Sequence, residues 1–471
     1  MRGVDDDKRA FKSSVARSTD KSNAGLSWLV LAFVIFNENS TKRTGIEERK
    51  NSLMKYIEEL EMQISQQEET YKSLSIKLDG LKEKSKNENP GHVHLKEVLE
   101  TLELQKPLVL NPTSIIVKGE PDEKEQDVVL PVLVFSCNRP DIRRSLDGLL
   151  KYRPDAKKFP IIVSQDCAHG ATAEVIRSYS SQVTYIQQPD QTEPVVPSGE
   201  YKFRGYFKIA RHYLWGLSQV FRTFNHSAVI IVEDDLDVAP DFFSYFSSTY
   251  QLLCKDPTLW CVSAWNDNGK ASLVDIQQGN QLLYRSDFFP GLGWMITREL
   301  WDELEPKWPR SYWDDWMRRP EQRKDRACIR PEISRTRTFG KVGVSNGMFF
   351  ENHLKFIKLN EIPVDFSKIN MSRLMQSTYD SDYVQHVYSL PVVSASDVRT
   401  NTNLPFDGPV RIAYHTKDAF KRAAKLLGLM NDFKSGVPRT GYRGIVSLFY
   451  NGRRVYLAPN SNWKGYDLTW S

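Results

Sequence analysis

The segment from Ala228 to Asp237 constrains the fold more than any other part of this 471-residue chain. It consists of Ala-Val-Ile-Ile-Val followed by Glu-Asp-Asp-Leu-Asp, so an apolar, mostly β-branched run ends in acidic residues. Such a run predicts a strand buried on both faces of a sheet. Ligands of open α/β sheets bind at the carboxyl ends of strands, so Glu233, Asp234 and Asp235 are placed to meet a metal or a polar ligand. A solvated acidic turn is the alternative interpretation.

A strand, helix, strand pattern precedes this segment and predicts a parallel pair of strands. The strands are expected at Val128 to Phe135 and Pro160 to Ser164, with the helix at Ile142 to Tyr152 between them. Arg139 and Asp166 follow these strands and therefore fall at the same rim as the acidic cluster. For each of them a surface salt bridge is the alternative to a ligand contact.

Residues Tyr201 to Phe221 predict an amphipathic helix that leads into the acidic strand, because apolar side chains recur there at three- and four-residue intervals. His212 lies beside this apolar stripe. A histidine in such a place is usually a partly buried structural residue, and a ligand contact is the alternative that its position before the acidic strand raises.

The sequence Trp313-Asp314-Asp315-Trp316 sets two carboxylates between indoles. Apolar neighbours raise the pKa of a carboxyl group, which suits a proton acceptor that works near neutral pH. The alternative is a helix start with a capping aspartate. The following basic segment, Arg318 to Arg326, is interpreted as a solvated face, with attraction of a diphosphate as the alternative.

A glycine-rich loop follows at Phe339 to Gly347. Its backbone N–H groups and the Ser345 hydroxyl are able to bind phosphate oxygens, although such loops are frequent. Beyond about Pro363 the composition changes, and Ile445 to Tyr450 and Arg453 to Leu457 predict a hairpin across Asn451-Gly452.

The net charge of +5 is mild, and no dense basic run is interleaved with aromatic residues, which argues against nucleic acid as a partner. The five cysteines form neither CxxC pairs nor clusters with histidine, which argues against a zinc site. Their odd number allows two disulfides and one free thiol. Cys137 and Cys167 are expected just past two strand ends on one edge, close enough for a disulfide.

The N-terminal part has a different composition. Six basic residues within 1–21 precede an uncharged, mainly apolar segment at 22–37, which resembles a signal-anchor. A cleaved signal peptide and a helix without a targeting role are the alternatives. In a helix that segment spans only about 24 Å, short of a bilayer core of about 30 Å. An apolar heptad pattern from Ile46 onwards then predicts a coiled-coil stem, with a long helix packed on the globular region as the alternative.

These observations predict a membrane-tethered lumenal protein with a globular catalytic region. The expected parts are a cytoplasmic tail (1–21), a signal-anchor (22–37), a coiled-coil stem (38–89), a linker (90–127), a catalytic domain (128–362) and a smaller supporting α+β domain (363–471).

Seven motifs in order resemble the N-acetylglucosaminyltransferase I family, over roughly residues 128 to 471. They are Cys137-Asn138-Arg139, Phe159 to Cys167, Tyr206 to Tyr213, Glu233-Asp234-Asp235, Trp265 to Gly269, Ser286 to Trp294 and Tyr312 to Trp316. The resemblance implies an α/β fold of the GT-A nucleotide-sugar-binding type, with a mixed, mostly parallel sheet. It also implies a Golgi type II membrane protein that transfers N-acetylglucosamine from UDP-GlcNAc, with inversion and with Mn²⁺. The implied acceptor is the alpha-1,3-mannose of an oligomannose N-glycan on a glycoprotein.

The resemblance also implies roles for single residues. Asp235 matches the manganese ligand and Asp314 the catalytic base, with Trp313 beside the acceptor. The matches to donor-binding positions are Arg139, Asp166, His212, Glu233, Asp234 and Ser345. The implied disulfides are Cys137 to Cys167 and Cys261 to Cys328, which leaves Cys254 free.

Two other functions are alternatives to this one. The related transferase that acts on protein O-linked mannose tends to alter the Glu-Asp-Asp cluster, which here follows the N-glycan enzyme. A non-catalytic lectin-like or scaffolding protein on the same fold should have lost Asp235 or Asp314, and both are present. Self-association through the stem is a further expectation.

Overall fold

The computed structural model describes residues 62, 72–73, 128–341, 343–344, 347, 349–405 and 408–470. The chain divides into two compact units, Met1–Val117 and Lys118–Ser471. The expected signal-anchor and linker, and all of the stem except residues 62, 72 and 73, lie outside the described residues. None of the helices that the described residues form has the length and apolar character needed to cross a membrane.

The second unit is built on an eight-stranded mixed sheet with the strand order β3-β2-β1-β4-β8-β6-β9-β7. Strands β3, β2, β1 and β4 run parallel to one another. Strand β8 is antiparallel to β4. The α/β class and the mixed, mostly parallel sheet are therefore confirmed. The bounds of these strands are β1 Val132–Ser136, β2 Ile161–Gln165, β3 Thr184–Gln187, β4 Ala228–Glu233, β6 Leu259–Ser263, β7 Leu283–Ser286, β8 Trp294–Thr297 and β9 Ala327–Pro331.

Strand β4 is the centre of this sheet, as its composition predicts. The side chains from Ala228 to Val232 are fully buried, and Glu233 is the first residue of the strand that is not. Successive side chains of a strand point to opposite faces, so Ile230 and Val232 join one hydrophobic cluster while Val229 and Ile231 join another. Burial on both faces explains why the apolar run is unbroken.

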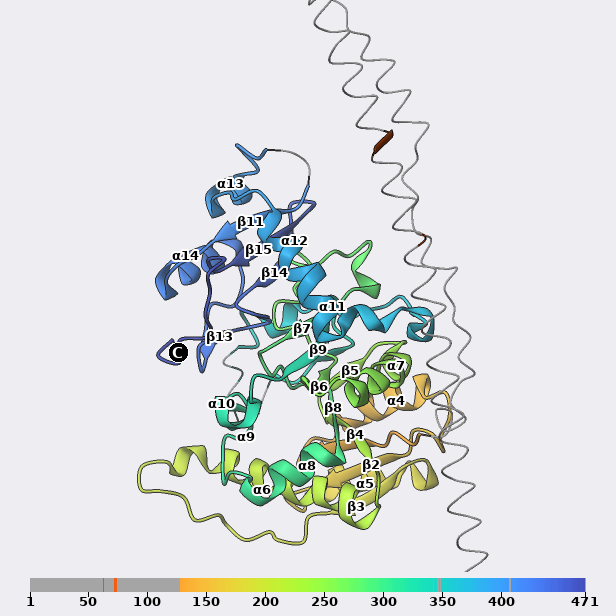
Figure 1. Cartoon of the computed structure of the whole chain (residues 1–471). Helices are drawn as coiled ribbons and strands as arrows, with labels where there is room; N and C mark the ends of the chain where they lie inside the picture. Colours follow the sequence, from red (N-terminus) through yellow and green to blue (C-terminus); the bar gives the residue numbers. More distant parts are fainter. Residues whose placement is uncertain are drawn as a thin grey trace, which may run out of the picture. The chain divides into compact units, whose positions relative to one another are not determined.

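Helices cover both faces of the sheet and give three layers. Helices α4 (Ile142–Tyr152), α5 (Gly170–Arg177) and α7 (Phe242–Lys255) contribute to the first cluster, and α6 (Arg204–Ser218) and α8 (Arg298–Leu304) to the second. Figure 1 shows α6 and α8 on one side of β4 and β8, and α4 and α7 on the other. The predicted helix at Tyr201 to Phe221 is divided into a 3₁₀ turn at Tyr201–Phe203, α6, and a π-helical turn at Gln219–Thr223.

A three-stranded sheet with the order β11-β15-β14 forms near the C-terminus. It has its own buried cluster, to which α14 (Lys417–Leu427) contributes Phe420, Ala424 and Leu427. The predicted hairpin is confirmed, since β14 (Val446–Tyr450) pairs antiparallel with β15 (Arg453–Ala458) across Asn451-Gly452. The division of the globular region at residue 363 stays a prediction.

The remaining elements are short or lie at the edges of these layers. The strands are β5 Leu236–Val238, β10 Thr336–Thr338, β11 Val410–Ala413, β12 Phe433–Lys434 and β13 Val437–Pro438. The helices are α9 Trp313–Met317, α10 Pro320–Arg323, α11 Gln376–Tyr379, α12 Gln385–Ser389, α13 Ala395–Thr400 and α14 Lys417–Leu427.

Candidate active site

The acidic cluster lies where the order of the parallel strands reverses. Chain connections run outward from β1 to β2 and β3 on one side, and β4 lies on the other side of β1. Such a switch point opens a crevice at the carboxyl ends of the two strands. The segments that follow β1 and β4 meet here, because Ser136 Oγ donates to Asp234 Oδ2 at 2.9 Å and Arg139 Nε donates to Asp234 Oδ1 at 3.0 Å.

Asp235 is held by a segment far away in the sequence. Strand β5 pairs antiparallel with β10, and Thr338 Oγ1 donates to Asp235 Oδ2 at 3.2 Å. Phe339 N–H donates to the Asp235 carbonyl at 2.9 Å. Gly340 lies so close that a Cβ at this position would overlap Asp235 Oδ2. The carboxylate is therefore packed against the backbone that begins the glycine-rich loop.

The other oxygen of Asp235 has no such support. Asp235 Oδ1 is buried and accepts no hydrogen bond from any described residue. An orphaned buried carboxylate oxygen is costly unless a ligand satisfies it. Hard oxygen atoms are the ligands that Mg²⁺ and Mn²⁺ prefer, so Asp235 fits a divalent metal.

Glu233 is linked to the Trp313 segment through Tyr213. The Tyr213 hydroxyl on α6 donates to Glu233 Oε1 at 2.9 Å, and the Tyr213 ring stacks on the Trp313 indole with the centroids 4.4 Å apart. Trp313 begins α9, which carries Asp314 and Asp315. One tyrosine thus connects the acidic cluster to the second pair of carboxylates.

Burial and mutual repulsion change the pKa values of the cluster. Burial, with the Asp235 charge adding to it, raises the pKa of Glu233 to about 7. Burial and then the Asp234 charge raise the pKa of Asp235 to about 6. Burial also raises the pKa of Asp234, against the opposing effect of Arg139. These three half-buried carboxyl groups lie close together and resist simultaneous ionisation, so a bound cation would stabilise their charged forms.

Asp237, the fourth acid of the segment, does not belong to this site. Arg144 on α4 binds it with Nε 2.6 Å from Oδ1, and Arg337 on β10 binds it with Nη2 2.9 Å from Oδ2. These contacts fix β5 against its neighbours, so the role of Asp237 is structural.

Asp314 and Asp315 occupy the first turn of α9, and Arg318 binds both. Arg318 Nη1 lies 2.7 Å from Asp314 Oδ2 and 2.9 Å from Asp315 Oδ1. The side chain of Asp314 is 44% exposed, so the indoles do not enclose it as the sequence interpretation assumed. The capping alternative does not hold either, because Tyr312 is the N-cap residue and no side chain caps this helix.

Asp315 has a second cationic partner. Lys434 Nζ lies 3.0 Å from Asp315 Oδ1. Burial alone would raise the pKa of Asp315, but Arg318 and Lys434 outweigh it and the pKa lies below its ordinary value. Asp315 thus pairs with both Arg318 and Lys434, whereas Asp314 pairs with Arg318. This difference favours Asp314 as the carboxylate that meets an incoming hydroxyl.

Asp166 lies at the same edge of the sheet, and His212 contacts β2 from α6, which covers one face. Asp166 follows β2, is buried, and accepts from Gln191 Nε2 at 3.1 Å. His212 Nε2 lies 2.8 Å from Ser164 Oγ, and burial lowers the pKa of His212 to about 4. Ser345 lies outside the described residues. The donor-binding roles of these three residues stay predictions.

Trp313 and the cysteines are structural in their contacts. The Trp313 indole is buried and stacks on Trp294, with the centroids 5.5 Å apart, as well as on Tyr213. Its expected place beside an acceptor stays a prediction.

Disulfides join Cys137 to Cys167 and Cys261 to Cys328, the pairs that the resemblance implies, and Cys254 is free.

Sequence reasoning did not find four of the positioning residues, namely Tyr213, Arg318, Thr338 and Lys434 as partners of the acidic side chains. Within the described part of the chain, no group of three or more histidine, cysteine, aspartate or glutamate side chains has the arrangement of a complete metal site. A single protein carboxylate is sufficient where a diphosphate supplies the other oxygen ligands.

Residues 51–470 match the model of the GNT-I family. The chain belongs to the GNT-I family. The match begins at residue 51, within the expected stem, so the family likeness extends further towards the N-terminus than the motifs indicated. As a GNT-I family member the chain is a glycosyltransferase, and its sheet is that of the GT-A fold expected from the sequence. A nucleotide-sugar donor and a glycan acceptor follow from that class.

One curated relative of this GNT-I chain is the alpha-1,3-mannosyl-glycoprotein 2-beta-N-acetylglucosaminyltransferase of Arabidopsis thaliana. It is 43% identical over 338 residues, which cover 71% of this chain and 74% of the relative.

Solved structures with a partial likeness are much more distant. A mannosyltransferase from Pyrobaculum calidifontis, solved with GDP-Man and Mn²⁺, has a TM-score of 0.30 at 13% identity, over 44% of this chain and 58% of that one. TarS from S. aureus (residues 1–349) has a TM-score of 0.32 at 12% identity, over 44% and 59%. These likenesses are too distant to support a statement about the site.

Proposed function

We propose that this chain is an N-acetylglucosaminyltransferase I that transfers N-acetylglucosamine from UDP-GlcNAc to the alpha-1,3-mannose of an oligomannose N-glycan. The new linkage is beta-1,2, and it starts the synthesis of hybrid and complex N-glycans. Membership of the family and the 43% identical relative support this activity. The observation that carries it is the Tyr213 contact, which joins the half-buried acidic cluster to the segment of Asp314 and so couples a proposed donor site to a proposed proton acceptor.

The donor side of the proposed site is the crevice between β1 and β4. Arg139 binds Asp234 and lies 3.9 Å from Asp235, so it orients both carboxylates and offers positive charge to a diphosphate. Asp235 would hold Mn²⁺ through the buried oxygen that no described residue satisfies. When bound, the metal neutralises the diphosphate that departs.

Asp314 is the proposed base of a single displacement with inversion. The acceptor hydroxyl oxygen bonds to the anomeric carbon while the bond from that carbon to the diphosphate oxygen breaks, and Asp314 takes the hydroxyl proton. The carboxylate is exposed enough for an acceptor to reach it, and Arg318 fixes its direction. One base is sufficient because the leaving group is a diphosphate and no covalent enzyme intermediate forms.

The proposed cellular place is the Golgi membrane. Residues 22–37 would anchor the chain as a single-pass type II protein, with the catalytic region in the lumen and the stem at 38–89 available for self-association. The apolar composition of that segment and the heptad pattern that follows it support this proposal.

The decisive experiment is a transfer assay with a panel of donors and acceptors. The purified full-length chain is expected to move N-acetylglucosamine from UDP-GlcNAc to a glycan that ends in alpha-1,3-mannose, and to lose activity with a chelator until Mn²⁺ is restored. A peptide with O-linked mannose serves as the competing acceptor. Transfer to the O-mannosyl peptide alone, transfer that ignores the chelator, or no transfer to any mannose-terminated acceptor would each contradict the proposal.

A further inference from the structure

A separate pocket lies near the C-terminus. It has a volume of about 200 Å³. Three parts of the chain line it, namely Tyr414 and His415 directly after β11, Gly436, and the last turns of the chain from Pro459 to Trp470. Pockets for drug-sized molecules have about 300–1,000 Å³. A volume below that range suits a single ring with its substituents. None of the side chains discussed for the transfer site lines it.

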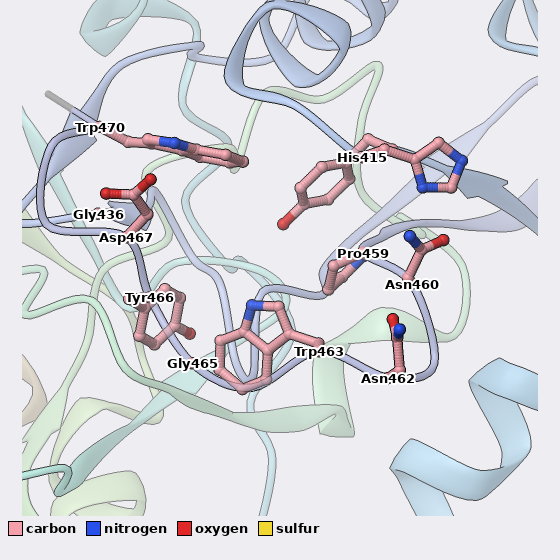
Figure 2. Close-up of a pocket in the computed structure, with 11 residues that line it drawn as sticks. His415, Gly436, Pro459, Asn460, Asn462, Trp463, Gly465, Tyr466, Asp467 and Trp470 are labelled. Carbon is pink, nitrogen blue, oxygen red and sulfur yellow. The ribbon is translucent and has the colours of Figure 1, made fainter.

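Aromatic rings form much of the lining. Figure 2 shows Trp470 and Trp463 on opposite sides of the space. The lining also includes the phenol rings of Tyr414 and Tyr466. Each indole is supported by another ring, because Trp463 packs edge-to-face on Tyr466 with the centroids 4.9 Å apart and Trp470 packs on Phe433 with the centroids 5.4 Å apart. Rings held in this way keep a fixed pocket, which reduces the entropy lost on binding.

The polar groups of the lining include two uncommitted amides, beside the His415 imidazole and the Asp467 carboxylate, which accepts hydrogen bonds from Thr469. The side chains of Asn460 and Asn462 are exposed and make no hydrogen bond to other described residues, and neither does the indole N–H of Trp463. An amide supplies both donors and an acceptor, which matches a ligand that carries several hydroxyl groups. No lysine or arginine is part of this lining, so a phosphate or sulfate group is not the expected ligand.

The pocket is connected to the candidate active site through one short hairpin. Strand β12 ends at Lys434, whose Nζ binds Asp315, and Gly436 follows two residues later as part of the pocket wall. Gly436 N–H donates to the Trp470 carbonyl at 2.9 Å. A Cβ at Gly436 would lie 2.5 Å from the Asp467 carbonyl oxygen, so only glycine lets the terminal segment close the wall at this point.

The pocket wall is also tied to the segment after β7. The Tyr466 hydroxyl donates to Asp287 Oδ2 at 2.5 Å, and Arg443 N–H donates to the same oxygen at 2.7 Å. The Asp287 side chain is buried. Two residues later, the Phe289 carbonyl accepts a hydrogen bond from Arg318, the residue that binds Asp314. The pocket therefore has a fixed position relative to the proposed base.

We infer that this pocket is a second carbohydrate-binding site that takes a neutral hexopyranose, namely a mannose unit of the acceptor glycan other than the one that receives N-acetylglucosamine. Sugar rings have an apolar C–H face that stacks on indoles and a rim of hydroxyls that pairs with amides. The sugar class follows from the lining alone. Its assignment to the acceptor rests on the proposed function and on the hairpin that joins the two sites.

The first test is direct binding to the full-length chain without UDP-GlcNAc. Methyl α-mannoside and an α-linked mannobiose are the probes, free N-acetylglucosamine represents the donor sugar, and saturation-transfer NMR is the readout. The mannosides are expected to bind in the presence of saturating UDP. Trp463→Ala and Asn462→Ala should each weaken this binding by about tenfold. Leu468→Ala is the matched control, because Leu468 is exposed in the same terminal segment but does not line the pocket.

The second test compares two acceptors in the transfer reaction. The quantity compared is kcat/KM for a branched oligomannose glycan divided by kcat/KM for a small mannose-terminated acceptor. Trp463→Ala should lower this quotient by about tenfold, and Leu468→Ala should leave it unchanged. Mannoside binding that survives both pocket substitutions, displacement of the mannoside by UDP, or preference for N-acetylglucosamine would overturn the inference. If the wild-type chain transfers to neither acceptor, the proposed function fails, while mannoside binding that depends on Trp463 would still support the sugar site.

Discussion

Gly340 lies directly against the carboxylate of Asp235, and a single added methyl group at position 340 would occupy the place of Asp235 Oδ2. The contact joins the second residue after β4 to the second residue after β10, which lie in distant parts of the chain. It makes the direction of the proposed metal ligand depend on a position that carries no side chain.

Gly340→Ala is therefore expected to displace Asp235 and to lower kcat/KM by about a hundredfold, the loss that a shift of about 1 Å can cause at a reacting centre. Mn²⁺ binding, measured by paramagnetic resonance of the added metal, should weaken in parallel. Gly343→Ala is the matched control, since a Cβ at Gly343 would meet no atom within 4 Å. Equal behaviour of the two variants would show that Gly340 does not position Asp235.

Arg318 should affect turnover more than donor affinity. It binds Asp314, Asp315 and the Phe289 carbonyl at the same time, and a lysine ammonium cannot reproduce that planar arrangement. Arg318→Lys is expected to lower kcat by about ten- to a hundredfold with little change in the Kd of UDP-GlcNAc. The neighbouring Arg319, which is exposed, provides the control Arg319→Lys. Loss of donor affinity in Arg318→Lys would place Arg318 on the donor side instead.

The buried imidazole of His212 should make the fold less stable in acid. Burial is the main cause that lowers its pKa to about 4, from an ordinary value near 6.5. Between these values the unfolded chain binds more protons, so the free energy of unfolding falls as the pH decreases from 6.5 to 4. The total loss is about 3 kcal/mol.

Urea denaturation at pH 7 and pH 4.5, compared between the wild type and His212→Gln, isolates this contribution. Glu233 and Asp235 act in the opposite direction, because their raised pKa values stabilise the folded state as the pH falls. Their effect cancels in the comparison of the two proteins. The wild type should lose more stability than the variant on acidification, and an equal loss in both would refute the assignment.

The two disulfides should differ in their effect on the site. Cys261 and Cys328 are paired residues of β6 and β9, and their bond closes a separation of 67 residues. Replacing both with serine should lower the free energy of unfolding by about 2 to 4 kcal/mol, without changing donor affinity.

Cys137 and Cys167 lie at the rim of the proposed donor crevice, where Cys137 N–H reaches Asp234 Oδ2 at 3.4 Å. Replacement of this pair should lower both stability and the affinity for UDP-GlcNAc, as measured by calorimetry. Cys254→Ser is the control, because this cysteine is exposed and free. Unchanged donor affinity after loss of the Cys137 to Cys167 bond would contradict the placement of the crevice.

The central part of the fold could be predicted because its signals are local. The unbroken apolar run of β4, the stripe of α4 and the Asn-Gly turn between β14 and β15 each depend on neighbouring residues. The parallel pairing of β1 with β2 followed from the helix between them. Since carboxyl ends of parallel strands share one edge, Arg139 could be placed beside the acidic cluster from sequence alone.

The contacts that orient the site could not be predicted in this way, because each joins distant segments. Thr338 reaches Asp235 only after β10 pairs with β5, and Lys434 reaches Asp315 only when the β12 hairpin lies against α9. The interpretation of Arg318 to Arg326 as a solvated face was wrong for Arg318 and Arg323, which are buried. Arg318 turns inward to bind Asp314 and Asp315, which lie four and three residues earlier in the chain. Unlike the other two contacts, this pairing has a local signal, the helical spacing of opposite charges.

The most direct test of the account compares Asp235→Asn with Asp314→Asn, because it separates donor binding from proton transfer. Calorimetry with UDP-GlcNAc and Mn²⁺ gives the affinity, and the transfer assay gives kcat. We expect Asp314→Asn to bind the donor like the wild type while kcat falls by about 10² to 10⁴-fold, and Asp235→Asn to lose about 10- to 100-fold in metal-dependent donor affinity. An equal loss of donor affinity in both variants would contradict the separation of roles between Asp235 and Asp314.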